Sequence, residues 1–411
     1  MTDLTRPRIT RVVLENWKSI ASCDVRLGDL TFLVGPNGAG KSNFLDALSF
    51  LCEALATTLD RAVLRRGNAY ELLRRASGTD SFGLRVEFAI PPKYSGHYAV
   101  RVEVRSFGQH LVRDEECVVE GEDARHFFRS SPAGVATSAS VPPAVSPDRL
   151  LLVSASGLPE FRPVFDLLAD LHVYNIDPSE MRVFARAGSG RTLSSDGANT
   201  AVILNKMSDE IRVRVSEYLS HVVPGLQGVT AEVIAGQGAP SRPQRSYMSD
   251  RLSALGETYV ALQFQQKVDA SEDGMSFSAM SMSEGTLRAL GVLIALLQDE
   301  GVPVVGIEEP EAAIHPGALG ALLDAMREAA NSRQVIVASQ SPDLLDDKDV
   351  NAEDILAVVT TDGATRIGPI DEVGRSVLRD RLFTAGEMMR MDQLSPEPSD
   401  GGPPQLFDIT S

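Results

Sequence analysis

Residues 35–42 have the sequence Gly-Pro-Asn-Gly-Ala-Gly-Lys-Ser. The apolar run from Leu30 to Val34 precedes them and predicts a buried strand, and residues 43–55 carry large apolar side chains at helical spacing. Strand, glycine loop and helix in this order are the context of a P-loop, whose backbone N–H groups turn inward around phosphate oxygens. The alternative, a plain glycine turn, is disfavoured because the motif arises by chance in such a chain on the order of one time in a hundred.

The loop predicts a set of phosphate-binding residues. Lys41 is expected to reach the outer phosphates of a nucleotide, and the Ser42 hydroxyl is expected to ligate Mg²⁺. The helix that begins at Lys41 adds the positive end of its dipole to the site. The nucleotide-binding residues predicted in and after the loop are Asn37, Gly38, Ala39, Gly40, Lys41, Ser42 and Asn43.

Length and composition exclude several classes of protein. The chain has 411 residues, enough for two or three lobes with a sizeable core. Its longest apolar run, Ala289–Leu297, is about half the length of a membrane span, and no secretory signal is visible at the N-terminus. Three scattered cysteines predict neither a disulfide framework nor a metal site. We therefore expect a protein of the reducing cytoplasm without a membrane segment.

The charge balance argues against a general nucleic-acid coat. The formal net charge is -17, whereas phosphate binding relies on a basic surface. A local basic cluster follows the first predicted helix, and we expect it to be a solvated helix face. Its members are Arg61, Arg65, Arg66, Arg74 and Arg75.

The rest of the chain alternates between β-rich and helical segments. Strands are expected at 9–17, 23–27, 82–90, 98–104, 110–120 and 259–266. Those at 82–90, 98–104 and 110–120 are expected to form an antiparallel meander. Helices are expected at 161–171 and, as one long helix, at 200–222. Loops are expected at 131–149, 187–198 and 236–250, with one strand pair and a closing helix in 354–391. Prolines and acidic residues predict a disordered tail at the C-terminal end.

A second constellation of residues lies in the C-terminal third. The apolar strand Val302–Ile307 ends in Glu308 and Glu309, where a nucleotide hydrolase needs carboxylates. We expect Glu308 to hold the Mg²⁺ shell and Glu309 to polarise the attacking water as general base. The alternative is an acidic loop at the end of a strand, which becomes less plausible beside a P-loop.

Two further segments are weaker signals. Ser283 is a natural N-cap for the apolar helix over 287–297, and together with Gly285 it gives a helix start suited to phosphate. An ordinary capped helix explains the same residues. The strand 334–338 ends in polar residues, of which Gln340 is expected to contact the γ-phosphate or the water, although strand-end residues facing solvent are the alternative.

The order of these motifs resembles the ABC-type ATPase heads of the RecF, SMC and OLD kind. The resemblance rests on LENWKS (14–19), GPNGAGKSN (35–43), MSEGTLR (282–288), GIEEPEAAIHP (306–316) and ASQSPDLL (338–345). It covers nearly the whole chain, from Ile9 to about Leu394. The resemblance implies an α/β fold with a mixed sheet around the P-loop, an antiparallel β meander and a helical signature lobe.

The resemblance also implies roles. Glu308 corresponds to the Walker B acid and Glu309 to the catalytic glutamate. Ser283 and Gly285 correspond to the signature that completes the ATP site of a second copy in a head-to-tail homodimer, with two ATP molecules between P-loop and signature. Lys18, with Ser19, lies where such heads place residues near the nucleotide, and His315 is expected to be structural. Gln340 stands where this family commonly has His, so hydrolysis is expected to be slow or differently gated.

The implied organisation has four parts. An N-terminal ATPase lobe spans 1–125, an inserted helical and loop lobe 126–256, a C-terminal ATPase lobe 257–394, and the disordered tail 395–411. No effector domain is recognisable, so the expected partner is a separate effector protein such as a nuclease, with DNA as a further candidate. Loops 131–149 and 236–250 are the expected partner contacts.

Several functions are compatible with these motifs. The favoured one is an ATP-hydrolysing dimeric switch in phage defence or genome maintenance. The alternative is a nucleotide-binding scaffold with negligible turnover, which Gln340 and the Glu-Glu pair suggest. A P-loop kinase or GTPase leaves the signature helix unexplained and shows no base-reading Asn-Lys-x-Asp element. A transporter subunit is disfavoured because no Q-loop glutamine or His switch is recognisable.

Overall fold

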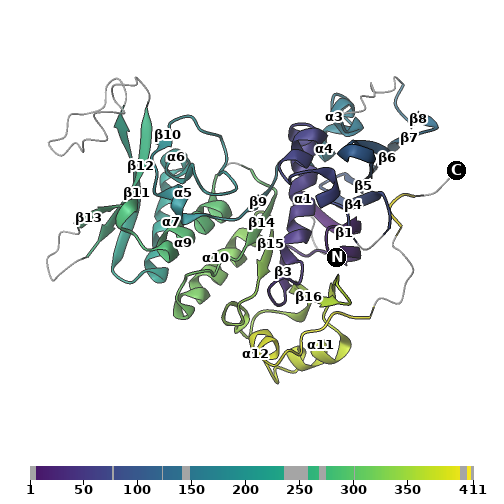
Figure 1. Ribbon diagram of the computed structural model, residues 1–411. Coiled ribbons are helices and arrows are strands. Elements are labelled where there is room, and N and C mark those ends of the chain that lie inside the picture. The colour runs from purple at the N-terminus through teal and green to yellow at the C-terminus, as the bar shows by residue number, and fades with distance from the viewer. Residues whose placement is uncertain are drawn as a thin grey trace. The chain divides into compact units, whose positions relative to one another are not determined.

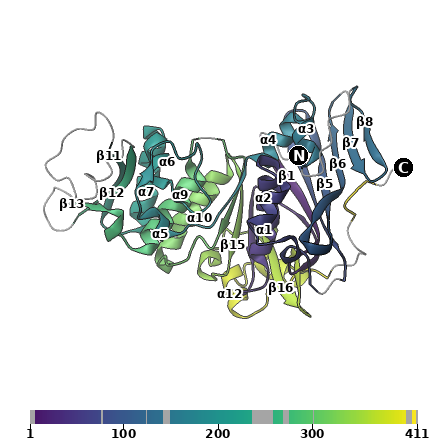
Figure 2. The same ribbon diagram turned by 45° about the horizontal axis from the view of Figure 1, so that its top comes forward.

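The computed structural model describes residues 6–75, 78–122, 124–140, 149–235, 258–267, 275–299, 301–398 and 405–408. The chain divides into two units, which are drawn in Figures 1 and 2. Unit 1 comprises Met1–Val173 and Ala330–Ser411, and unit 2 comprises Tyr174–Ala329. The mixed α/β fold predicted from the sequence is confirmed. Among the described residues no helix is both long and apolar enough to cross a membrane.

Unit 1 is built on a mixed sheet. Its strands are β1 (Arg8–Trp17), β2 (Ile20–Arg26), β3 (Leu30–Val34), β4 (Ser81–Ile90), β5 (Tyr94–Val104), β6 (His110–Glu120), β7 (Arg125–Ser131), β8 (Gly134–Thr137), β15 (Gln334–Ser339), β16 (Ile355–Thr361) and β17 (Ala364–Pro369). Their order in the sheet is β8-β7-β6-β5-β4-β1-β2-β17-β16-β3-β15. The stretch from β8 to β2 is antiparallel, which confirms the predicted meander, whereas β3 pairs in parallel with β15 and β16.

Six helices of unit 1 are described: α1 (Lys41–Ala56), α2 (Leu59–Leu64), α3 (Leu151–Ala155), α4 (Arg162–Ala169), α11 (Glu372–Arg379) and α12 (Ala385–Arg390). Helix α1 packs against β1, β15 and α4 (Figure 1). Its buried residues include the apolar positions that predicted it. At this contact Trp17 of β1, Phe50 of α1 and Phe82 of β4 form a ring cluster with centroids 5.1–5.6 Å apart. This packing anchors the helix that follows the P-loop.

The loop predicted over 131–149 is wrong in its first part. Strand β7 continues to Ser131, and β8 returns over Gly134–Thr137. Gly134 has φ +127°, which suits the tight turn, and Val135 and Thr137 alternate with more exposed neighbours along β8. The segment is rich in Pro, Ala and Ser, and the alternation of β-branched residues in β8 is only four residues long. The sequence pattern therefore did not reveal this strand. Residues 141–148 lie outside the described part of the chain.

Unit 2 contains α5 (Pro178–Met181), β10 (Ala185–Arg186), α6 (Thr200–Lys206), α7 (Asp209–Val222), β11 (Leu226–Ala235), β12 (Tyr259–Gln266), β13 (Met275–Ser278), α9 (Glu284–Leu297) and β14 (Val304–Glu308). Strand β9 (Leu171–Tyr174) and helix α10 (Leu319–Ala330) include the unit boundaries. β10, β11 and β13 each pair antiparallel with β12, with α6 and α7 beside them (Figure 2). Most of α9 is buried, as its continuous apolar sequence predicts.

The single long helix predicted over 200–222 is wrong. It breaks into α6 and α7 because Met207 and Ser208 are extended, with ψ near 150°. Asp299 explains the break: its carboxylate accepts hydrogen bonds from the Ser208 backbone N–H (2.7 Å) and hydroxyl (2.9 Å). This tertiary contact replaces the helical bonding of that segment. The predicted loop at 236–250 lies outside the described residues.

The C-terminal region also departs from prediction. The strand pair expected after residue 354 is β16 and β17, but the closing helix is two short ones, α11 and α12. The disordered tail predicted over 395–411 is wrong for its described parts. Pro396 forms a β-bridge with Ile370, and Leu406 and Phe407 are buried, with 2% and 7% of their surface exposed.

Candidate nucleotide site

The P-loop of unit 1 joins β3 to α1 as predicted. Gly40 has φ +107°, a backbone conformation that L side chains rarely adopt. A Cβ on Gly40 would lie 2.2 Å from the Thr365 hydroxyl oxygen, and one on Gly35 would lie 1.9 Å from the Val358 carbonyl oxygen. Gly38 is different, because a Cβ there would meet nothing within 4 Å. Two of the loop glycines are thus dictated by close packing against β16 and β17.

The side chain of Lys41 lies within the loop. Its residue surface is 5% exposed, and Nζ donates hydrogen bonds to the carbonyl oxygens of Gly35 (2.8 Å) and Pro36 (3.0 Å). The loop therefore holds the ammonium group next to its own backbone. Asn37, Gly38 and Ser42 are exposed, so the loop surface and the first-turn hydroxyl of α1 are accessible. This arrangement fits an anion-binding loop.

A chain of hydrogen bonds supports the loop from the sheet side. The Asn43 side-chain amide of α1 donates to the Ser19 hydroxyl (2.7 Å), which shares a 2.6 Å hydrogen bond with the Thr365 hydroxyl. Thr365 in turn donates to the Ala39 carbonyl oxygen (2.8 Å). Sequence reasoning identified Ser19 and Asn43 but missed Thr365. No local pattern marks a threonine more than 300 positions from the loop, which β17 brings there by pairing with β2 at Ile20.

Lys18 lies beside this network, but its side chain is held by a residue of α1. It has φ +48° and its ammonium group forms an ion pair with Asp46 of α1 (2.5 Å). Lys18, Ser19 and Asn43 line a cavity of about 700 Å³, whose wall also includes Arg66. Lys18 thus lies next to the helix that follows the P-loop, and its predicted place near a nucleotide stays a prediction.

The basic cluster after α1 is exposed at Arg61, Arg65 and Arg75, as its sequence predicts, but not at Arg66. Arg65, Arg74 and Arg75 also line this cavity. Arg66 has a side chain 8% exposed, which binds Asp46 (2.7 Å) and Glu53 (2.8 Å) and packs over the Phe50 ring. Arg66 therefore ties this segment to α1 rather than facing solvent, because two carboxylates of α1 compensate its buried charge.

Gln340 lies at the same sheet edge as the P-loop. In the parallel pair β15–β3, Ser339 is opposite Val34, so Gln340 and Gly35 follow at matching positions. Ser339 is fully buried and its hydroxyl accepts from the Ser341 N–H (3.0 Å). Gln340 is half-buried. The structure brings this predicted residue to the P-loop edge of the sheet.

The predicted signature residues lie at the start of α9 in unit 2. The Ser283 hydroxyl accepts from the Thr286 N–H at 3.1 Å, which confirms the predicted N-cap. Ser283 and Glu284 are exposed. Gly285 is buried, and a Cβ there would lie 2.1 Å from the Ala313 carbonyl oxygen. The start of this helix is therefore accessible at its cap, Ser283, and tightly packed two residues later at Gly285.

The acidic strand end forms a compact turn in unit 2. β14 ends at Glu308, and the next residue, Glu309, has φ +42°. Such a left-handed conformation is uncommon for a residue with a side chain and occurs often at functional sites. Both carboxylates are half-buried. His315 caps the following turn, its Nδ1 accepting from the Gly317 N–H at 3.1 Å, which agrees with a structural role.

The site residues are thus divided between the units. The P-loop, Lys18 and Gln340 belong to unit 1, whereas Ser283, Gly285, Glu308 and Glu309 belong to unit 2. Each set is assembled within its own unit. The approach of the two carboxylates to the P-loop, and their predicted roles, stay predictions.

Comparison with known families identifies the chain. The family described as "AAA domain, putative AbiEii toxin, Type IV TA system" matches residues 30–138 and 204–346. The chain belongs to this AAA-domain family. Within it, the chain is an ABC-type ATPase of the RecF/SMC group, as the order of motifs predicts.

Two curated relatives of this AAA-domain protein illustrate the group. The DNA replication and repair protein RecF of Porphyromonas gingivalis is 31% identical over 135 residues, 29% of this chain and 37% of RecF. The chromosome partition protein Smc of Aquifex aeolicus is 32% identical over 130 residues, 30% of this chain and 10% of Smc. The alignments thus span only about a third or less of these relatives' own length.

Solved structures show the same fold. An Smc head bound to the C-terminal winged-helix domain of ScpA has a TM-score of 0.54 at 14% identity, covering 89% of this chain and 99% of that chain. An Smc head with an extended coiled coil, bound to the C-terminal domain of ScpA from Pyrococcus furiosus, has a TM-score of 0.55 at 11% identity, covering 91% and 99%. These similarities support the ABC-type ATPase fold of the AAA-domain chain.

Proposed function

We propose that the protein is an ATP-binding and ATP-hydrolysing switch that dimerises head to tail, with ATP between the P-loop of one copy and the Ser283 helix of the other. The observation that carries the proposal is the P-loop itself. Lys41 is held inside the loop, the exposed Ser42 lies in the first turn of α1, and Thr365 fixes the loop backbone from behind. This is the set of donors that a triphosphate requires.

The proposed roles follow from the chemistry of the side chains. Backbone N–H groups of Asn37–Gly40 and the Lys41 ammonium group bind the phosphates. The Ser42 hydroxyl and the Glu308 carboxylate are hard oxygen donors suited to Mg²⁺, which neutralises phosphate charge when bound. Glu309 accepts a proton from the attacking water, and Gln340 orients that water or the γ-phosphate.

Support for the dimer comes from the accessible cap of α9. Ser283 and Glu284 are exposed at the end of an otherwise buried helix, so a second copy has access to the positive end of the helix. In the dimer, Ser283 and Gly285 complete the partner's ATP site. Gly285 contributes by permitting close packing against Ala313.

The nucleotide state is proposed to control a separate effector, such as a nuclease, or DNA, in phage defence or genome maintenance in the cytoplasm. The solved Smc heads are bound to a protein partner, ScpA, and the RecF relatives take part in DNA replication and repair. These relationships make a partner protein and DNA the first candidates to examine. The net charge of -17 favours a local rather than a general nucleic-acid contact.

The decisive experiment compares three variants of the full chain with the wild type. Glu309→Gln with ATP is expected to accumulate as a dimer in light scattering and to release phosphate at least tenfold more slowly. Lys41→Ala is expected to show neither dimer nor phosphate release. Glu122→Gln, a matched change at an exposed residue of the meander, is expected to behave as wild type. A Glu309→Gln protein that stays monomeric with bound ATP would falsify the switch.

The second candidate is a nucleotide-binding scaffold with negligible turnover. Gln340 at the position that is commonly His in this group favours it. Wild-type phosphate release equal to that of Lys41→Ala, together with intact ATP binding, would establish the scaffold and exclude the hydrolase.

A further inference from the structure

A short C-terminal segment is docked on the β meander of unit 1. Leu406 and Phe407 are buried and form a cluster with Val13 of β1 and Ala99 of β5. Most other residues on this face of β1, β4 and β5 are charged, among them Arg85 and Arg101. Val13 and Ala99 are small, so they leave a shallow apolar patch on a face that is otherwise mostly charged. Leu406 and Phe407 cover this patch.

Each apolar residue of the segment has its own place. A Cβ on Gly83 of β4 would lie 2.2 Å from Leu406 Cδ1, so the leucine occupies the space that this glycine leaves. The guanidinium of Arg101 lies 5.2 Å from the centre of the Phe407 ring. Arg101 is in turn held by Glu15 at 3.0 Å. A cation over an aromatic face is attracted by the negative face of the ring, so Arg101 favours an aromatic residue at this position.

Polar contacts fix the backbone and the acidic residue. Arg85, 7% exposed, donates to the Leu406 carbonyl oxygen (3.1 Å) and to Asp408 Oδ1 (2.8 Å). Glu116 accepts from the Asp408 N–H at 2.9 Å. The buried charge of Arg85 needs such partners to be stabilised. Arg85 therefore fixes the backbone at Leu406 and favours an acidic residue at position 408.

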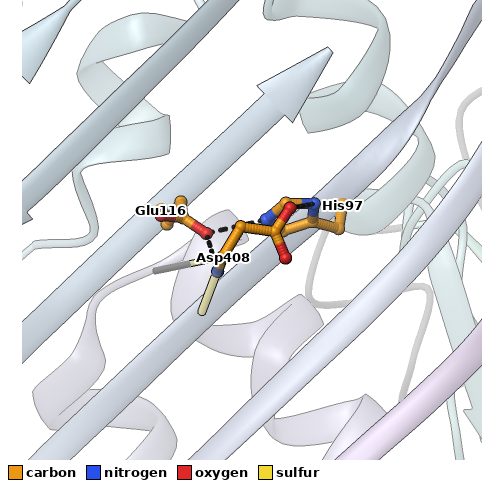
Figure 3. Close-up of side chains that lie close together, drawn as sticks. All are labelled: His97, Glu116 and Asp408. Atoms are coloured by element: carbon orange, nitrogen blue, oxygen red, sulfur yellow. Dashed lines mark hydrogen bonds and ion pairs between the residues drawn. The ribbon is translucent and has the colours of Figure 1, made fainter. Parts of the chain in front are cut away.

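His97 completes the acidic end of the contact (Figure 3). Its Nε2 lies 2.8 Å from Glu116 Oε1, and its Nδ1 lies 3.8 Å from Asp408 Oδ2. Although burial raises the pKa of Asp408, the hydrogen bond from Arg85 and the charge of His97 outweigh it and lower that pKa below its usual value. The ionised form of the aspartate is therefore favoured at this place.

These three side chains are also metal-ligating types, with ligand atoms within 4.8 Å of one another. The imidazole, however, lies between the two carboxylates and presents a different ring nitrogen to each. One ion can bind only one of these nitrogens, and Arg85 already occupies Asp408 Oδ1. The geometry favours direct recognition of a peptide over a metal site.

We propose that Gly83, Arg85, His97, Arg101 and Glu116 form a peptide-docking face that recognises the sequence Leu-Phe-Asp. Its ligand is the chain's own segment 406–408, and a free peptide of the same sequence competes with it for the face. Three residues bury far less surface than a stable protein interface, so attachment to the same chain holds the segment in place. A contact of this kind exchanges readily with a competing peptide.

The test uses the full chain and a fluorescent peptide, acetyl-Gln-Leu-Phe-Asp-Ile-Thr-Ser-amide, in anisotropy titrations. The double variant Leu406→Ser with Phe407→Ser vacates the face and is expected to bind the peptide at least tenfold more tightly than the wild type. Adding Arg85→Gln to this variant is expected to abolish binding. Adding Arg113→Gln, a change at an exposed arginine of β6, is expected to leave it intact.

Three outcomes overturn the proposal. These are no binding by a double variant that keeps its circular dichroism spectrum, equal binding by the wild type, and binding that EDTA abolishes and Zn²⁺ restores. The last outcome establishes a metal site instead. If the double variant does not fold, Asp408→Lys provides the same test, because it keeps both apolar residues and reverses the charge that Arg85 binds. It is expected to bind the peptide more tightly than wild type, and equal binding overturns the proposal.

Discussion

The hydroxyl of Thr365 donates a 2.8 Å hydrogen bond to the carbonyl oxygen of Ala39, from strand β17 to the middle of the P-loop. The C=O and N–H of a trans peptide point in opposite directions. Fixing the Ala39 carbonyl toward β17 therefore turns the Gly40 N–H away from β17. Thr365 is 2% exposed, so this contact is shielded from water. A residue far along the chain thus sets the orientation of one peptide of the P-loop.

Replacing Thr365 by valine is expected to weaken ATP binding about tenfold. Valine keeps the shape but leaves the buried Ala39 carbonyl without this donor, which costs about 1–3 kcal/mol. Thr365→Ser keeps the hydroxyl and is expected to bind ATP as wild type. Titration calorimetry with a non-hydrolysable ATP analogue measures the difference.

Thr360→Val serves as the control for this experiment, because Thr360 is the exposed cross-strand neighbour of Thr365 in β16. It is expected to leave the affinity unchanged. Wild-type affinity in the Thr365→Val protein would show that the loop keeps its orientation without this bond.

Replacing Ser283 by arginine is expected to prevent ATP-dependent dimerisation and to leave ATP binding by the monomer intact. The exposed cap is the surface that we propose the second copy's nucleotide approaches, and a long side chain obstructs it. Size-exclusion chromatography with light scattering measures the dimer, and a fluorescent nucleotide measures binding.

Ser283→Asn distinguishes the cap from the interface. Asparagine is as good an N-cap as serine, so this variant is expected to retain helix stability and dimerisation. If Ser283→Arg dimerises at the same ATP concentration as the wild type, the proposed role of this helix is contradicted.

Much of the site was predictable because its signals are local. The sequence of residues 35–42 predicts the loop, the apolar periodicity after it predicts α1, and Ser283 before an apolar run predicts the cap of α9. Each of these depends on backbone conformations and caps that neighbouring residues determine. For the same reason the strand ends at Glu308 and Ser339 were located correctly to within one residue.

The failures have tertiary causes. Thr365 becomes a P-loop contact only through the pairing of β17 with β2, and the break at Ser208 depends on Asp299, which is distant in sequence. Leu406 and Phe407 lie in a proline-rich acidic region that predicts disorder. They are nevertheless buried, because Gly83 leaves space for Leu406 and Arg101 lies over the Phe407 ring, and both contacts come from strands about 300 residues earlier.

Replacing Glu115 by glutamine is expected to remove a pH dependence of stability. Glu115 is buried and accepts hydrogen bonds from the Leu151 N–H (2.6 Å), the Leu152 N–H (2.8 Å) and the Tyr98 hydroxyl (2.9 Å). Burial raises its pKa to about 7, because the hydrogen bonds only partly oppose the loss of solvation. The folded protein thus holds a proton that the unfolded chain releases near its ordinary pKa of 4.5.

The sign of this dependence follows from linkage. Between about pH 4.5 and 7 the folded state binds more protons, so the free energy of unfolding falls as the pH rises and levels off above 7. The loss is on the order of 3 kcal/mol. Urea unfolding at pH 5 and pH 7.5 measures it. Glu115→Gln is expected to lose this decrease and Glu122→Gln to keep it; identical profiles for Glu115→Gln and wild type would refute the assignment.

Replacing Gly35 by alanine is expected to abolish ATP binding, whereas Gly38→Ala is expected to have a smaller effect. A Cβ on Gly35 would lie 1.9 Å from the Val358 carbonyl oxygen, a backbone atom of β16 that cannot move without disturbing the sheet. Gly38 has open space around it, and its φ of +75° costs an alanine roughly 1–2 kcal/mol.

Thermal unfolding and nucleotide titration of the two variants separate these effects. Gly35→Ala is expected to lower Tm and to show no measurable affinity for ATP, because the loop must shift away from β16. Gly38→Ala is expected to fold and to bind ATP with at most a tenfold loss. The reverse order would mean that contact with the nucleotide, rather than packing against β16, determines which loop glycine is indispensable.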